Sequence, residues 1–194
     1  DDNNRGLYSY TFTGNSWDSG SLQQHTSNLF DYSNNKNGNR NFDLAYEKNS
    51  GDLLVCWSDE SLDGFYYASK ERGSTWSDNF SYTYSNDAQS IFITLAAKEN
   101  SDRIAIASAQ DDQRIHTAMW NGISMEDGYR GNNTDNVYST AGTGDFPIGV
   151  AWLGESAYAM YRNNGVGGYI YIYKWTTTWV AMTNYPVTDL ADCE

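Results

Sequence analysis

The chain has 194 residues, of which 12 are Lys or Arg and 25 are Asp or Glu, so its formal net charge is −13. A surface this acidic repels nucleic acid and anionic lipid, which excludes both as partners. No apolar run reaches the roughly 18 residues that a membrane span requires, and we therefore expect no membrane insertion.

Residues 1–20 are predicted to form half of a repeat unit. The aromatic-rich run from Leu7 to Phe12 is followed by a Gly-Asn turn and by Trp17. Two such segments around a tight turn are typical of a β-hairpin. Residues 21–41 are rich in Asn and Ser, and we expect a long polar loop there.

Residues 42–82 contain a complete module. Four short β-type segments follow one another, each rich in aromatic and aliphatic residues, at Phe42–Tyr46, Leu53–Trp57, Phe65–Ser69 and Arg72–Trp76. The breaks between them hold Gly, Asn, Asp and Ser, which adopt the backbone conformations that tight turns need. The module is therefore predicted to be a four-stranded antiparallel meander.

The same module recurs twice, at residues 83–127 and 146–183. Phe42, Ile93 and Ile148 are its equivalent starting points and lie 51 and 55 residues apart. A period near 50 with four strands per unit is typical of propeller-type arrays. Residues 128–145 are predicted to form a second polar loop between the last two modules, and residues 184–194 form an acidic tail.

The predicted fold is therefore all-β, with consecutive four-stranded antiparallel modules packed as propeller-like blades. Three blades are complete, and the N-terminus adds half a blade. No segment shows sustained helical periodicity, so the chain is expected to form one structural domain without helices.

One eight-residue segment resembles the Asp-box of sialidase-like propellers. The pattern matches at Ser69, Gly73, Thr75 and Trp76, while Glu71 stands where the family has Asp. The resemblance implies a structural turn between the third and fourth strands of a blade, with the Trp packed inward. It concerns fold and carries no activity with it.

The sequence predicts that the protein is not an enzyme. Sialidase-like enzymes use an arginine triad and a Tyr nucleophile with a Glu partner, and no stretch of this chain matches that set. The two histidines, His25 and His116, have no second ligand at a spacing suited to zinc. We expect no metal and no cofactor.

Cysteines and glycosylation patterns bear on the compartment. Cys56 and Cys193 lie far apart in sequence, and two interpretations remain open: a disulfide that ties down the tail, or a buried free thiol at Cys56. Asn79 and Asn132 match the N-glycosylation pattern. Together with the Tyr-, Asn- and Gly-rich composition, these features favour an extracellular or cell-surface protein.

The preferred function is structural. Half a blade leaves an unpaired strand edge and an apolar face, which a soluble monomer normally avoids. We expect the protein to assemble with copies of itself through this edge, as a filament or surface-layer subunit. The predicted assembly residues are Leu7, Tyr8, Tyr10, Phe12 and Trp17.

Two alternatives stand beside this prediction. Trp57, Trp152, Trp175 and Trp179 would either stack on sugar rings, as in a glycan-binding lectin, or belong to the core between blades. Alternatively, residues 1–194 are one piece of a larger secreted propeller that binds a protein partner.

Overall fold

The computed structural model describes residues 6–12, 15–29, 40–59, 61–83, 89–110, 114–130, 148–162, 169–182 and 185–186. All regular elements in these ranges are β-strands, so the predicted all-β class is confirmed. The same ranges contain no helix long and apolar enough to cross a membrane.

The chain begins with an N-terminal hairpin, formed by β1 (Leu7–Phe12) and β2 (Trp17–Thr26). The two strands pair antiparallel as a two-stranded sheet. The predicted boundary at residue 20 was wrong, because β2 continues six residues further into the segment predicted as loop. Its second half is polar and mostly exposed, with only His25 buried, so it lacks the apolar alternation that identifies a strand.

The first full sheet contains β3 (Phe42–Tyr46), β4 (Leu53–Trp57), β5 (Gly64–Lys70) and β6 (Phe80–Thr83), paired antiparallel in chain order. The fourth strand was predicted at Arg72–Trp76. That segment instead forms the turn and a single bridge from Trp76 to Lys70, and the strand follows at β6.

Two further sheets repeat this order. The second full sheet contains β7 (Ser90–Ala97), β8 (Ile104–Gln110), β9 (Ile115–Trp120) and β10 (Met125–Arg130). The third full sheet contains β11 (Ile148–Leu153), β12 (Ser156–Arg162), β13 (Tyr169–Trp175) and β14 (Trp179–Ala181), and β15 (Tyr185–Pro186) also pairs with β13. The predicted four-stranded antiparallel modules are thus confirmed.

One boundary in the second full sheet differs from the prediction. β10 runs to Arg130, which lies inside the segment predicted as loop from residue 128 onward. Its pairing with β9 contains an irregularity between Glu126 and Tyr129. The polar composition of this edge strand hides it from a search for apolar alternation.

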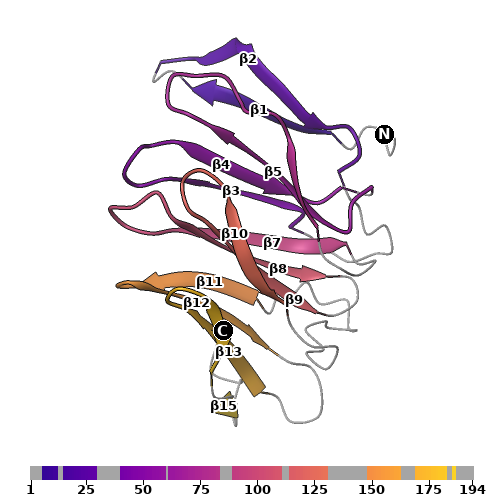
Figure 1. Ribbon diagram of the computed structural model, residues 1–194. Helices are drawn as coiled ribbons and strands as arrows, with labels where there is room; N and C mark the ends of the chain where they lie inside the picture. Colours follow the sequence, from indigo (N-terminus) through magenta and orange to yellow (C-terminus); the bar gives the residue numbers. More distant parts are fainter. Residues whose placement is uncertain are drawn as a thin grey trace.

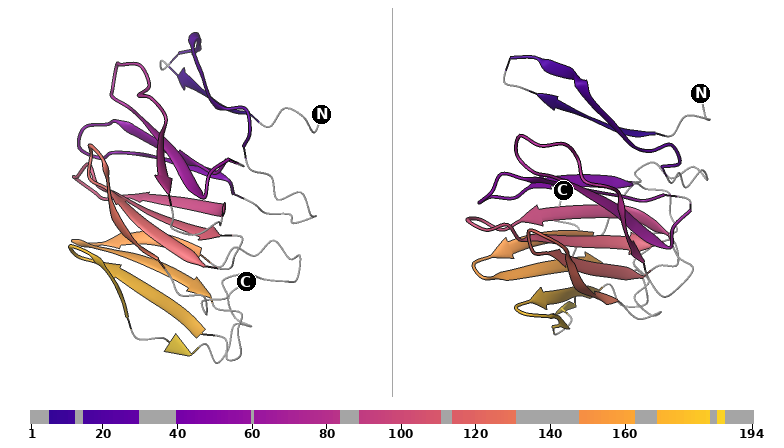
Figure 2. Two further views of the ribbon diagram at one scale, coloured as in Figure 1. Left: turned by 45° about the vertical axis from the view of Figure 1, so that its right-hand side comes forward. Right: turned by 45° about the horizontal axis from the view of Figure 1, so that its top comes forward.

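The sheets stack face to face in chain order, from the N-terminal hairpin at one end to β15 at the other (Figures 1 and 2). One buried cluster joins Leu54, Cys56 and Phe65 of the first full sheet to Ile93 and Ile106 of the second. Another joins the second and third full sheets around Met119, Tyr161 and Trp175. The described sheets form an open stack, and a closed propeller stays a prediction.

Polar contacts also cross from sheet to sheet. The Asp43 carboxylate accepts a hydrogen bond from the backbone N–H of Leu95 at 2.8 Å. Trp120 donates its indole N–H to the buried Glu47 carboxylate at 2.5 Å. Burial raises the pKa of Glu47, and hydrogen bonds from Ser50 and Trp120 oppose that shift. These bonds fix the offset between neighbouring sheets, because each buried acceptor needs its donor.

Candidate functional site

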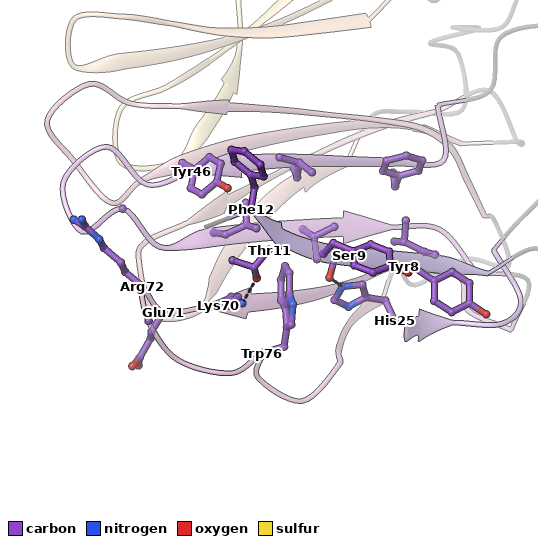
Figure 3. A pocket seen from close by; sticks show the side chains of 18 of the residues that line it. Tyr8, Ser9, Thr11, Phe12, His25, Tyr46, Lys70, Glu71, Arg72 and Trp76 are labelled. Carbon is purple, nitrogen blue, oxygen red and sulfur yellow. Dashed lines mark hydrogen bonds between the residues drawn. The ribbon is translucent and has the colours of Figure 1, made fainter. Parts of the chain in front are cut away.

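An apolar cleft of about 560 Å³ lies between the N-terminal hairpin and the first full sheet (Figure 3). The hairpin supplies one wall and β3 the other, while β5 and the turn after it close one side. Its walls carry aromatic and aliphatic side chains, principally Tyr8, Tyr10, Phe12, Trp17, Phe42, Leu44, Tyr46 and Trp76.

β1 forms the first wall of this cleft. Leu7 is 8% exposed and packs on Val55, Trp57 and Ala68, so it anchors the hairpin to the first full sheet. By contrast Tyr8, Tyr10, Phe12 and Trp17 are between 47 and 68% exposed. β1 pairs with β2 along one edge, and no described strand pairs with its other edge. The predicted assembly residues therefore divide into one anchor and four exposed aromatic side chains.

β3 forms the second wall. Phe42, Leu44 and Tyr46 lie on one face of the strand, because alternate residues point the same way. They are 42, 48 and 57% exposed. Sequence reasoning missed this half of the cleft, because the corresponding strands of the later modules show the same alternation and are buried. The alternation therefore does not tell an exposed face from a covered one.

The equivalent residues of the later sheets are covered. Ile93 at the corresponding position of β7 is fully buried, and Leu95 packs in the cluster shared with the first full sheet. Ile148 and Val150 of β11 pack in the cluster shared with the second full sheet. In each case the preceding sheet provides the cover. In the described part of the chain the N-terminal sheet has two strands, and the β3 face beside it stays exposed.

Few polar groups enter the cleft. Lys70 donates a hydrogen bond from Nζ to the Thr11 hydroxyl at 2.6 Å, and its Nζ lies 5.9 Å from the centre of the Trp76 ring. Glu71 and Arg72 line the rim and are exposed. The cleft is thus an apolar surface with a mixed-charge rim.

His25 lies at the base of the hairpin, 5% exposed. Its ring centre is 5.2 Å from that of Trp57 and 4.5 Å from that of Trp76. Nε2 lies 3.0 Å from the Ser9 hydroxyl. Burial lowers the pKa of His25 from 6.5 to about 4, against the opposing effect of a hydrogen bond with Asn79. The imidazole is therefore neutral at physiological pH and packs as part of the core.

The segment that resembles an Asp-box lies between β5 and β6, the third and fourth strands of their sheet. Gly73 has a φ of +81°, which glycine adopts without strain. Ser69 exchanges hydrogen bonds with Ser77 across the turn, and Trp76 packs half-buried on the cluster under the hairpin. Glu71 and Thr75 are exposed.

Asp52 contributes to the same turn. Its carboxylate, from the turn between β3 and β4, accepts the backbone N–H of Arg72 at 2.7 Å. A carboxylate that comes from another turn leaves no signal in the local motif, which is why sequence reasoning missed it.

The tryptophans considered for sugar stacking are mostly core residues. Trp57, Trp175 and Trp179 are at most 6% exposed. The indole N–H of the partly buried Trp152 donates to the carbonyl of Ala96 at 2.9 Å. These four side chains hold sheets together, whereas the exposed rings of Tyr8, Tyr10, Phe12, Trp17, Phe42 and Tyr46 lie at the cleft.

Two of the remaining predicted residues, Cys56 and Asn79, do not line the cleft. Cys56 is fully buried with a free thiol, and burial raises its pKa well above the ordinary value, with a further contribution from Asp43. Asn79 is exposed and donates to the His25 carbonyl at 2.8 Å. Cys193 and Asn132 lie outside the described residues. No cluster that could hold a metal ion occurs within the described ranges.

Fold and cleft together define an all-β protein built from stacked four-stranded antiparallel sheets, with a two-stranded hairpin at one end. No family model, no curated protein and no solved structure matches this chain.

Proposed function

We propose that this is a non-catalytic structural protein of the extracellular space or cell surface, which assembles with copies of itself through its incomplete N-terminal blade. The observation that carries this proposal is the apolar cleft. One edge of β1 has no partner among the described strands, and it lies beside the exposed face of Phe42, Leu44 and Tyr46.

Strand addition is the interaction that suits such a site. A strand placed beside β1 would satisfy the backbone groups of its free edge, and side chains of the added strand would cover the β3 face. The two partners in such a contact use different surfaces. Contacts of this heterologous kind propagate into filaments unless they close into a ring.

The proposal includes a propeller-like arrangement of the sheets. The N-terminal hairpin then corresponds to half of a blade, and the Asp-box-like turn at Ser69–Trp76 is a structural feature of the first complete blade. A charge of −13 keeps assemblies dispersed by mutual repulsion at low salt.

The proposal assigns no catalytic role to the cleft. Glu71 is the one carboxylate among the described lining residues, whereas glycoside hydrolysis generally requires a pair of carboxyl groups. His25 is buried between two tryptophans, with Nδ1 enclosed and Nε2 3.0 Å from the Ser9 hydroxyl, and the proposal does not treat it as a general base.

Sedimentation velocity over a concentration series, with electron microscopy of the same samples, tests the proposal. Phe12→Lys places a charge beside the free edge, and Ile123→Lys is its matched control, because Ile123 is 87% exposed in a turn of the second full sheet. We expect the wild type and the control to assemble and Phe12→Lys to stay monomeric. A wild-type chain that is monomeric at every concentration would refute self-assembly.

Deletion of the whole hairpin is a less informative experiment than these substitutions. Leu7 and His25 cover Val55, Trp57 and Trp76, so the deletion would expose part of the core. Loss of assembly would then have two explanations.

Glycan binding is the second candidate function, because the rings at the cleft are exposed. Trp17 is 68% exposed and Tyr10 is 52% exposed, and a cleft of about 560 Å³ falls within the range of small-molecule sites. A glycan array probed with the wild type and with Trp17→Ala tests this. Binding of one sugar class that the substitution abolishes would favour it, and an array without signal would remove it.

A further inference from the structure

We propose that the apolar cleft is the seat of a two-stranded β-hairpin from a partner chain. The second strand of that hairpin pairs antiparallel with β1, and its cleft-facing side chains are small and apolar. This inference rests on the proposed function in taking the cleft as a strand-accepting site. It adds the number of strands, their direction and their chemistry.

The number of strands follows from the positions of β1 and β2 in the repeat. In the second and third full sheets, the turn between the third and fourth strands is flanked by a facing pair of large side chains, Trp120 with Met125 and Trp175 with Trp179. The N-terminal hairpin has Phe12 facing Trp17 at its own turn. β1 and β2 therefore correspond to third and fourth strands, and the described residues supply no first or second strand to their sheet.

The place of the two missing strands coincides with the cleft. In each full sheet the second strand lies between the first and the third, so the missing second strand belongs at the free edge of β1. The missing first strand then lies beyond it, over the exposed face of Phe42, Leu44 and Tyr46. The residues next to these two positions, in β1 and on the exposed face of β3, line the cleft.

The direction follows from the existing sheets. β4 runs antiparallel to β5, and β8 runs antiparallel to β9. A second strand beside β1 in the same arrangement is antiparallel to it. A short turn then returns the chain as the first strand, so the added element is one hairpin.

The side-chain chemistry follows from the existing interfaces. The face of β8 toward the third full sheet carries Ala105, Ala107 and Ala109, and it packs in the same cluster as Ile148 and Val150. At this interface the second strand of the covering sheet therefore presents small side chains, while Phe92 of its first strand and Met119 of its third are larger. Phe42 and Leu44 are larger than the corresponding Ile148 and Val150, and Tyr46 corresponds to Trp152. A second strand that covers this face must therefore present small apolar residues, as β8 does, to keep the sheets at ordinary spacing.

A peptide with the sequence of residues 90–110, closed by a disulfide between added terminal cysteines, is a suitable probe. It is the β7–β8 hairpin, which covers the equivalent face of the third full sheet. A control peptide carries Lys in place of Ala105 and Ala107. Binding of labelled peptide to the full chain is followed by fluorescence anisotropy, and hydrogen exchange reports on the β1 amides.

We expect saturable binding of the probe, slower exchange of β1 amides, and at least a tenfold weaker affinity for the control peptide. Leu44→Lys in the full chain should weaken binding by a similar factor, whereas Ile123→Lys should not. Equal binding of both peptides, or binding without protection of β1, would overturn the inference.

A fused chain provides a second test that does not depend on peptide folding. Residues 90–110 are joined ahead of Gly6 through a copy of residues 111–114, the natural connection between second and third strands. We expect a thermal midpoint about 5 °C or more above that of a fusion bearing the two Lys substitutions. An equal midpoint for the two fusions would contradict the hairpin.

The two proposals can fail separately. A chain that binds the probe but never associates with itself keeps the hairpin inference and refutes self-assembly. A chain whose assembly is abolished by Phe12→Lys but which does not bind the probe keeps self-assembly and refutes the hairpin as the occupant. A chain that assembles equally well with the cleft occupied by saturating probe, or in the fused form, refutes both proposals.

Discussion

The triple variant Phe42→Thr, Leu44→Thr and Tyr46→Thr should lose self-association, while its isolated subunit stays folded. Thr retains β-propensity but withdraws most of the apolar surface of the cleft wall. The face is roughly half exposed in the isolated chain, so each substitution should change the free energy of unfolding by less than about 1 kcal/mol.

The effect on association is larger. With 42 to 57% of each side chain exposed, the three residues offer together about 250 Å² of apolar surface, given the usual size of such side chains. At about 25 cal/mol per Å², covering that surface contributes about 6 kcal/mol to association. Leu44→Thr alone should remove about 1.5 kcal/mol, or roughly tenfold in the dissociation constant.

Sedimentation equilibrium measures the association, and urea unfolding measures the stability of the same variants at a concentration where the subunit is monomeric. Ile123→Thr is the matched control, since it removes apolar surface from a residue that is 87% exposed and distant from the cleft. If the triple variant associates as tightly as the wild type, the cleft is not the contact. If its loss of association merely follows a loss of folding, the β3 face is structural.

Three further outcomes follow from buried groups. The unfolded chain protonates His25 near pH 6.5 and the folded chain only near pH 4, so the free energy of unfolding should fall as the pH falls through that window, by at most ~3 kcal/mol. Urea unfolding of His25→Gln should show no such loss, and a pH profile of this variant identical to that of the wild type would contradict the role of His25. Trp120→Phe leaves a Glu47 oxygen without its indole donor and should cost about 1–3 kcal/mol in urea unfolding; an unchanged midpoint would show that the bond contributes little. In a Cys193→Ser background, the buried Cys56 thiol should react with thiol reagents only at the rate of unfolding, and rapid labelling of the native chain would show that it is accessible.

The strand order was predictable because its causes are local. Leu53–Trp57 and Ile104–Ala107 are nearly continuous apolar runs, and both lie in strands that other sheets cover on two faces. Turn residues between the runs set hairpin connections. The ends of β2 and β10 escaped prediction because these edge strands are held by backbone pairing and carry polar side chains.

The cleft shows where sequence reasoning stops. The exposed aromatic side chains of the hairpin followed from counting strands, since half a blade must leave one edge free. Phe42, Leu44 and Tyr46, by contrast, have the same alternation as Ile93 and Leu95, which are covered.

By itself, the sequence determined the all-β class, the four-stranded modules and the hairpin ahead of them, because alternation and turn chemistry act between near neighbours in the chain. Only the tertiary structure decided which apolar face stays open. Burial of a sheet face depends on the sheet stacked against it. The described sheet that precedes β3 has two strands, whereas the sheets that precede β7 and β11 have four strands each.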